Sequence, residues 1–224
     1  MYRINRCMRP IAREVIEGFR TIAVPTIGDA QGRFGCMSYA IKPLSPSMRI
    51  VGCAVTVQTY RADNLLLHVA LEMAQEGDVL VVDAGAIPDT GLWGGLMTRM
   101  ALRKGIGGLI IDGGVRDSQE LISLGFPVFA RAVSPQGGFK ASPGSVNVPV
   151  SCGGTAVHPG DLIVADADGV VVVASADAPD ILVKAQAVQA KEAALIEKMD
   201  RGETLFSLLG LGESLNRLGL KIPE

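Results

Sequence analysis

The sequence has no marked excess of charge of either sign. Its 224 residues contain 21 lysines and arginines against 23 aspartates and glutamates, which gives a formal net charge of -2. Nucleic-acid binding depends largely on neutralising phosphates with a surplus of basic side chains. We therefore expect no nucleic-acid partner, whereas a protein partner is compatible with this composition.

Long apolar segments and paired cysteine motifs are also missing. No apolar run approaches the roughly 18 residues that a membrane-spanning helix needs, so we expect no membrane anchor. The four cysteines, Cys7, Cys36, Cys53 and Cys152, show no C-x-x-C spacing, which argues against a zinc ribbon. In the absence of a signal peptide, this cysteine pattern predicts reduced thiols and a cytoplasmic location.

Aromatic residues are scarce, at 4% of the chain, although 48% of its residues are hydrophobic. The core must therefore consist mainly of valine, leucine, isoleucine and alanine. The length allows one large domain or two small ones. Because no low-complexity linker divides the chain, we expect a single domain over residues 1–224.

Helical and strand patterns alternate between residues 64 and 133. Strands are expected at 79–83, ending in Asp83, at 109–112, and at 127–133. Helices are expected at 64–74, at 96–105 with Gly105 as a C-cap, and at 118–125. This alternation predicts an α/β fold in which parallel strands are joined by helical crossovers.

The flanking regions have other patterns. A strand rich in valine and threonine is expected at 48–60, and short strands separated by turns at 146–152, 161–166 and 169–174. We also expect a short helix at 9–18, a long amphipathic helix at 178–200 and a final helix at 203–218.

An arginine and an aspartate, Arg116 and Asp117, stand side by side just after a predicted strand and two glycines. One interpretation is structural: Asp117 and Glu120 form a capping box for the next helix, and Arg116 is a solvated charge. The other is functional, because ligands of open α/β sheets bind beyond the carboxyl ends of the strands. There Asp117 could bind Mg²⁺ or Mn²⁺ and Arg116 a substrate carboxylate.

A second loop with affinity for anions is expected after the preceding strand. The first turn of its helix contains backbone N–H groups without intrahelical partners, and glycines allow an anion to approach them. Alternatively, these glycines only let the helix and strand pack closely. The turn comprises Gly94, Gly95, Leu96 and Met97.

The segment "WGGLMTRMALRKGIGGLIIDGGVRD" resembles the family of 4-hydroxy-4-methyl-2-oxoglutarate aldolases and the RraA-like regulators of ribonuclease E. The similarity extends over nearly the whole chain, with "TIGDA", "GCAVTV", "DN", "GDVLVVD", "FPVFARAVSP" and "VHPGDLIVADADGVVVV" in the same order. The resemblance implies a swivelling β/β/α sandwich that assembles as a trimer or hexamer, with sites between subunits.

The resemblance also implies roles for individual residues. It places the pyruvate-binding loop on Gly94, Gly95, Leu96 and Met97, the substrate-binding arginine on Arg116, and the metal-ligating aspartate on Asp117. Family members usually carry an acidic residue at the position of Gly95, twenty residues before the Arg-Asp pair, where it helps to orient metal-bound water. This chain lacks that carboxylate.

Two functions from different classes follow. The first is a metal-dependent class II pyruvate aldolase, which cleaves a 4-hydroxy-2-oxo acid with Mg²⁺ or Mn²⁺ on Asp117 and also decarboxylates oxaloacetate. The second is a non-catalytic regulator that binds an RNA-processing enzyme.

Other residues carry less weight as site candidates. His68 in its apolar helix and His158 in a turn are expected to be structural. Lys104 and Lys140 show no sign of a lowered pKa that would favour a Schiff base. Asp83 and Asp112, at the ends of their strands, could support a metal site or could simply form turns.

Overall fold

The centre of the molecule is a sheet of eight strands. The computed structural model describes residues 2–222. The strand order is β1-β5-β4-β3-β2-β9-β10, and β6 pairs with β2. Four neighbouring strands are parallel: β2 (Ile50–Gln58), β3 (Val79–Trp93), β4 (Gly108–Val115) and β5 (Val128–Val133). Antiparallel strands complete the sheet: β1 (Lys42–Pro43), β6 (Ser145–Val146), β9 (Leu162–Asp166) and β10 (Gly169–Val173).

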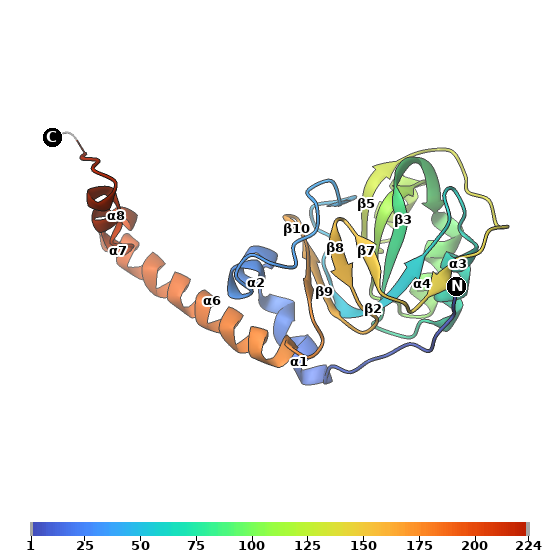
Figure 1. Cartoon of the computed structure of the whole chain (residues 1–224), viewed down its shortest axis with the longest axis horizontal. Coiled ribbons are helices and arrows are strands. Elements are labelled where there is room, and N and C mark those ends of the chain that lie inside the picture. Colours follow the sequence, from blue (N-terminus) through green and yellow to red (C-terminus); the bar gives the residue numbers. More distant parts are fainter. Residues whose placement is uncertain (1, 223–224) are drawn as a thin grey trace.

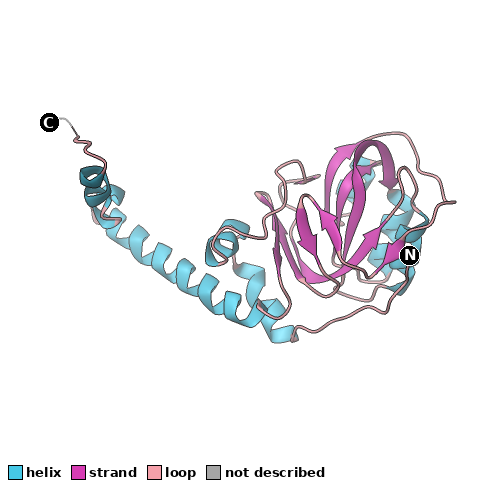
Figure 2. Ribbon diagram, in the orientation of Figure 1, coloured by secondary structure: helices cyan, strands magenta, loops and turns pink. Residues whose placement is uncertain are grey.

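A helix connects each parallel strand to the next. These helices are α3 (Leu65–Met73), α4 (Gly95–Arg103) and α5 (Ser118–Ser123). Because the parallel strands follow one another across the sheet, right-handed crossovers place all these helices on the same face (Figure 2). There Leu67 and Leu121 pack with the strand residues Leu80, Trp93 and Ile111 in one hydrophobic cluster.

A small hairpin covers the opposite face of the sheet. It consists of β7 (Val150–Cys152) and β8 (Thr155–Val157), and Val150 and Val157 pack there against Val81, Ile110 and Phe129. The layers are therefore hairpin, sheet and helices. This arrangement confirms the expected α/β class and the β/β/α type of sandwich.

A third cluster packs a segment near the N-terminus and the start of the long C-terminal helix against strands β2, β9 and β10. It contains α1 (Arg13–Gly18), a 3₁₀ turn (Phe19–Thr21), α2 (Val24–Ala30) and the first turns of α6 (Ala178–Asp200). Beyond these turns α6 projects from the body, and α7 (Leu205–Leu208) and α8 (Leu211–Arg217) lie at its far end (Figure 1). Within residues 2–222, none of the helices combines the length and apolar character needed to cross a membrane.

The main alternation was predicted correctly, and the left-handed φ angles of Gly105 and Gly125 mark the expected helix ends. Strand β3 was placed wrongly: it does not end at Asp83 but continues with irregular register to Trp93. Gly113 and Gly114 lie opposite this extension within β4, which continues to Val115 and so past its expected end at Asp112. A Cβ on residue 114 would lie 2.6 Å from the carbonyl oxygen of Thr90.

Three other boundaries also differ from the expected ones. The first helix begins at Arg13, four residues later than expected. The segment 146–152 is divided at Asn147, which has a left-handed φ of 55°, and its two parts join different sheets. The final helix is broken at Gly210, whose φ of 65° separates α7 from α8.

Candidate functional site

The predicted site residues lie together at the carboxyl edge of the parallel strands. Arg116 directly follows β4, and its backbone N–H donates to the carbonyl oxygen of Trp93, at the end of β3, over 2.8 Å. This contact joins the loop before α5 to the loop before α4. The two loops bring together Gly94, Gly95, Leu96, Met97, Arg116 and Asp117.

The carboxylate of Asp117 binds a different helix from the one expected. Its Oδ2 accepts the N–H of Gly95, the first residue of α4, over 3.0 Å. It makes no capping hydrogen bond to α5, and Glu120 pairs with Arg99 instead. The capping-box interpretation is therefore wrong, because Asp117 caps the neighbouring crossover helix and not its own.

The backbone of Asp117 explains this orientation. The residue adopts a left-handed conformation, with φ 57° and ψ 35°. Aspartate and asparagine tolerate this region better than other residues with a side chain, and such conformations cost on the order of 1–3 kcal/mol. The turn directs the carboxylate back toward α4, where its Oδ2 also lies 3.5 Å from Nε of Arg116.

Gly94 is needed for this close approach. A Cβ on residue 94 would lie 2.5 Å from Oδ2 of Asp117 and 3.1 Å from Nε of Arg116. With Gly95 N–H bound to Asp117, the N–H groups of Leu96 and Met97 in the first turn of α4 have no intrahelical partner. They are available to an anion beside the Arg116 guanidinium.

A pocket of about 120 Å³ lies beside Arg116. Asn64 lies on its wall and is only 8% exposed. The Asn64 amide nitrogen donates to the carbonyl oxygen of Leu92 over 2.8 Å, whereas its Oδ1 is buried and has no partner among the described residues. The pocket therefore carries basic groups, and an acceptor without a partner among the described residues is buried in its wall. Its polar side chains are those of Asn64, His68, Arg116 and Lys140.

Asp63 positions the loop that carries Lys140. Its side chain is buried and accepts the N–H groups of Leu65, Ala141 and Ser142 over 2.9, 2.7 and 2.8 Å. Burial alone would raise the pKa of Asp63, but these backbone hydrogen bonds outweigh it and lower the pKa. The ionised carboxylate thus fastens the 139–142 loop beside the start of α3.

His68 lies in the same pocket, one turn into α3. Desolvation by the surrounding atoms lowers the pKa of its imidazole, and the nearby positive charge of Lys140 lowers it further. His68 is therefore a neutral hydrogen-bonding group at neutral pH. The sequence did not predict this position, because the neighbours of His68 along the helix are apolar.

Asp83 and Asp112 have partners other than the predicted site. Asp112 forms an ion pair with Arg131, and its Oδ2 accepts the N–H of Gly153 over 2.8 Å, which fastens the hairpin turn to the sheet. Asp83 accepts the N–H of Gly85 over 3.0 Å within its own strand. Their contacts are those of turns and layer packing.

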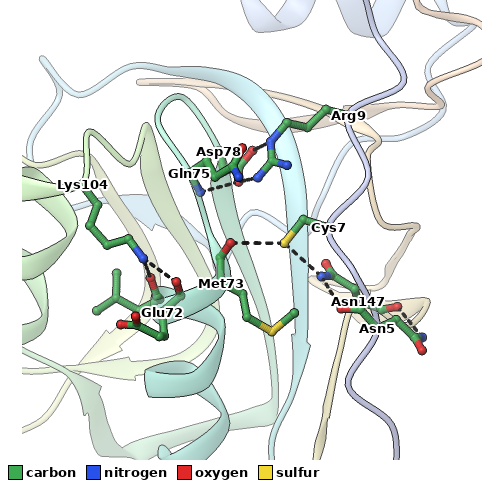
Figure 3. A network of polar contacts seen from close by, with 10 residues as sticks. Asn5, Cys7, Arg9, Glu72, Met73, Gln75, Asp78, Lys104 and Asn147 are labelled. Carbon is green, nitrogen blue, oxygen red and sulfur yellow. Dashed lines mark hydrogen bonds and ion pairs between the residues drawn. The ribbon is translucent and has the colours of Figure 1, made fainter.

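Lys104 and His158 are also structural. The ammonium group of Lys104 donates to the carbonyl oxygens of Leu71 and Glu72 at the end of α3 (Figure 3). It follows the last residue of α4, about 13 Å along the helix from Gly95. His158 forms a turn with Asp161, whose Oδ2 accepts the His158 backbone N–H over 2.8 Å.

A larger hollow, of about 390 Å³, lies between the N-terminal segment and β2. Its most buried charges are already paired, because Arg9 donates two hydrogen bonds to Asp78 (Figure 3). The smaller pocket is the better candidate for chemistry, since Arg116 and Lys140 line it and the buried Oδ1 of Asn64 in its wall has no hydrogen-bond partner among the described residues.

Comparison with known proteins identifies the family. A family model described as "RraA-like: Aldolase/RraA" matches residues 24–172. The chain belongs to the RraA-like family. The match includes every predicted site residue and the pocket beside Arg116 but ends before α6. The expectation that one domain extends over residues 1–224 therefore stays a prediction outside this range.

Relatives within the RraA-like family have two kinds of name. The chain is 39% identical, over 81% of its length and 86% of the relative's, to a protein of Halalkalibacterium halodurans named as a candidate 4-hydroxy-4-methyl-2-oxoglutarate aldolase. It resembles the structure of Streptomyces coelicolor RraAS2, described as an unusual member of the RNase ES inhibitor RraA family. That match has a TM-score of 0.73 and 30% identity, and it covers 85% of this chain and 99% of the other.

A third similarity is to an uncharacterized Pseudomonas syringae protein, with a TM-score of 0.78 and 31% identity. It covers 89% of this chain and 98% of the other. Membership of the RraA-like family is thus compatible with a lyase function and with a regulatory function.

Asp117 is the one predicted metal ligand in this RraA-like site. Within residues 2–222, no group of three or more histidine, cysteine, aspartate or glutamate side chains could hold a metal ion. Asp117 keeps its Oδ1 free of hydrogen bonds to the described residues, and its side chain is 41% exposed. A single carboxylate with access to solvent fits Mg²⁺, which retains several water molecules when it binds proteins.

Asn64 was missed as a binding residue, and His68 and Lys140 were given little weight. Asn64 and Lys140 are far apart in the sequence and line one pocket because two sets of hydrogen bonds join their segments. Asp63 binds the 141–142 backbone, and the backbone of Phe139 binds that of Ala62 and Asn64. The sequence does place Asp63 and Asn64 directly before a helix. However, aspartate and asparagine at such a position are typical of a helix N-cap, so the pair did not indicate a binding site.

Proposed function

We propose that the chain is a divalent-metal-dependent lyase of the class II pyruvate aldolase type. Its substrate would be a 4-hydroxy-2-oxo acid of the 4-hydroxy-4-methyl-2-oxoglutarate kind, cleaved to release pyruvate, with decarboxylation of oxaloacetate as a related activity. The observation that carries this proposal is the placement of Arg116, Asp117 and the free N–H groups of α4 beside one basic pocket.

Arg116 and the backbone of α4 would bind the carboxylate next to the 2-oxo group. The guanidinium offers a planar pair of donors, and the N–H groups of Leu96 and Met97 stand at the positive end of the α4 dipole. Lys140 and the neutral His68 line the same pocket and would bind the far end of a diacid substrate.

Asn64 is suited to hold the hydroxyl group that reacts. Its buried, unpaired Oδ1 would accept a hydrogen bond from the 4-hydroxyl. In retro-aldol cleavage this hydroxyl loses its proton, the C3–C4 bond breaks, and its electron pair passes into the enolate of pyruvate, which is then protonated. Asp117 would hold Mg²⁺ or Mn²⁺, which supplies Lewis-acid stabilisation of that enolate.

Pyruvate release from 4-hydroxy-4-methyl-2-oxoglutarate and from oxaloacetate tests the proposal. Activity should vanish with EDTA and return with Mg²⁺ or Mn²⁺. Asp117→Asn preserves the left-handed turn and should lose activity at limiting metal, with partial recovery in excess Mn²⁺. Trapping of a pyruvate adduct on a lysine by borohydride would contradict the metal mechanism.

The second candidate function is binding to an RNA-processing enzyme without catalysis. The similarity to RraAS2 and the missing carboxylate at Gly95 favour it. Retarded cleavage of an RNA by a ribonuclease E-type enzyme in the presence of this chain, together with metal-independent background rates of pyruvate release, would support this function over the lyase.

We also propose that copies of the chain assemble as a trimer or hexamer. Leu205 and Phe206 on α7 and Leu211 on α8 are 39–46% exposed in the single chain. Exposed apolar surface of this kind favours association with another copy. Sedimentation that showed only monomers at micromolar concentration would contradict the proposal.

A further inference from the structure

The larger hollow, of about 390 Å³, lies at the opposite edge of the sheet from the proposed lyase site. It is lined by side chains from residues 9–20, the start of β2 and the turn before β3, so it stands at the amino edge of the parallel strands. The segment 9–20 lies outside the family match, which begins at residue 24. Small-molecule pockets typically have volumes of about 300–1,000 Å³. The hollow is therefore large enough for a small ligand of its own.

The most buried part of the lining is apolar. Ile11, Val51 and Cys53 are buried members of the third hydrophobic cluster, and Ile16 packs against that cluster. Burial raises the pKa of the Cys53 thiol, so this group stays neutral and behaves as a small apolar side chain. A hydrocarbon chain placed here would be removed from water, which raises affinity by about fourfold for each CH₂ group that becomes buried.

Three arginines and three carboxylates surround this apolar part, and two pairs of them neutralise each other. Arg9 donates two hydrogen bonds to Asp78 (Figure 3). Arg20 donates to Glu17 over 2.5 Å, and this hydrogen bond lowers the pKa of Glu17. These four side chains therefore offer no net charge to a ligand.

Arg13 and Glu76 are the charged side chains of the lining that remain. Among the described residues, Arg13 forms no ion pair, although its positive charge contributes to the lowered pKa of Glu17. Glu76, in the turn before β3, has no basic partner within the same part of the chain. The hollow thus presents one uncompensated charge of each sign, and the two charges come from different segments.

We propose that this hollow binds a small zwitterion with a hydrocarbon body, of the ω-amino acid type. Arg13 donates to its carboxylate through the planar fork of the guanidinium. Glu76 accepts from its ammonium group, and its hydrocarbon body covers the apolar part of the lining. The inference does not rest on the proposed lyase function, because none of the residues of that site lines this hollow.

Saturation-transfer difference NMR on the full chain, with three probes of equal carbon number, tests the proposal. The probe 6-aminohexanoate carries both charges, hexanoate only the negative one, and hexylamine only the positive one. We expect 6-aminohexanoate to bind most tightly, because it alone pairs with both Arg13 and Glu76. Each singly charged probe should bind about threefold to fivefold more weakly, as expected for the loss of one partly exposed ion pair.

Two variants assign the two charges. Arg13→Gln should weaken the binding of 6-aminohexanoate and hexanoate by about threefold to fivefold and leave that of hexylamine unchanged. Glu76→Gln should weaken 6-aminohexanoate and hexylamine to the same extent and should not weaken hexanoate. The controls are Arg6→Gln and Glu14→Gln, which change exposed side chains of the N-terminal segment outside the lining and should bind all probes like the parent.

The outcomes that overturn the inference are distinct. If hexanoate binds as tightly as 6-aminohexanoate and only Arg13→Gln weakens either, the ligand is a simple anion and the zwitterion is wrong. If no probe binds, or if both variants bind all probes like the parent, the hollow is not a site for such ligands. The proposed lyase stands or fails separately, through the release of pyruvate.

Discussion

The body of the molecule and its projecting C-terminal part use similar apolar residues in opposite ways. In the body, side chains such as Leu80, Ile110 and Phe129 are fully buried between layers. In the projecting part, none of the residues of α7 and α8 is buried, and Leu218 is 72% exposed. All predicted site residues lie in the body. We infer that the chemistry depends on the body and that the projecting part serves contacts with other molecules.

The largest effect is expected from a charge in the body. The Arg116 side chain is 46% exposed in the free chain, and a bound substrate would bury the charge pair between its carboxylate and the guanidinium. Arg116→Ala should then raise the free-energy barrier for kcat/KM by about 2–5 kcal/mol, because it removes one partner of that pair. Added Mg²⁺ should not rescue it. The matched control is Arg217→Ala on α8, and steady-state pyruvate release measures both. An equal loss of kcat/KM in the two variants would contradict the inference that the chemistry depends on the body alone.

A pair of substitutions within α6 compares the two environments along a single helix. Ile181 is 8% exposed in the third hydrophobic cluster, whereas Val183 is 66% exposed. Ile181→Ala should lower the free energy of unfolding by about 2–5 kcal/mol. Val183→Ala should change it by no more than about 0.5 kcal/mol. Urea denaturation provides the measurement. A large effect at Val183 would show that its face of α6 is covered in solution.

The pH dependence of stability should depend on Asp63 in the body. Its folded pKa is lowered, so its contribution is fully present above the unfolded pKa of about 3.9 and is lost as the pH falls through the folded value. Asp63→Asn should destabilise the protein at pH 7 by about 1–3 kcal/mol, since it weakens hydrogen bonds to a charged group. The difference from the parent should shrink by pH 3. Urea denaturation at both pH values measures this. If the free energies of unfolding of the variant and the parent differ by the same amount at pH 7 and pH 3, the charge of Asp63 does not contribute to stability.

The smallest effect on folding is expected from truncation. A chain that ends at Ala190 keeps the packed turns of α6 and loses α7 and α8. Its free energy of unfolding should stay within about 0.5 kcal/mol of the parent, because none of the removed residues that the structure describes, 191–222, is buried. Sedimentation should show a smaller assembly than the parent. An unchanged assembly would place the subunit contacts on the body instead.

The sequence predicts well those features that depend on local periodicity. The parallel crossovers between residues 64 and 133 follow from alternating helical and strand patterns, and the bounds of α6 match the amphipathic segment 178–200. Each of these patterns lies within a single element. The glycines after helices, such as Gly105 and Gly125, mark helix ends because they adopt left-handed φ angles without strain.

Features that depend on contacts between residues far apart in the sequence could not be predicted from local periodicity. Asp117 resembles an N-cap, but its partner is the N–H of Gly95, 22 residues earlier. Strand β3 continues beyond Asp83 because glycines on β4 permit an irregular close approach, which no local pattern of β3 records. Nor does any local pattern show that the 141–142 backbone binds Asp63 and so brings Lys140 beside Asn64.

The position of Trp93 provides a spectroscopic reporter of the site without any label. It is the only tryptophan of the chain, is fully buried, and directly precedes Gly94. Its indole stacks on Phe126, with ring centroids 6.0 Å apart, and donates to Oγ1 of Thr98 in α4 over 2.7 Å. All indole fluorescence of the protein therefore originates at the loop that we propose binds pyruvate. Emission recorded during a titration with pyruvate or Mg²⁺ would follow occupancy of that loop directly.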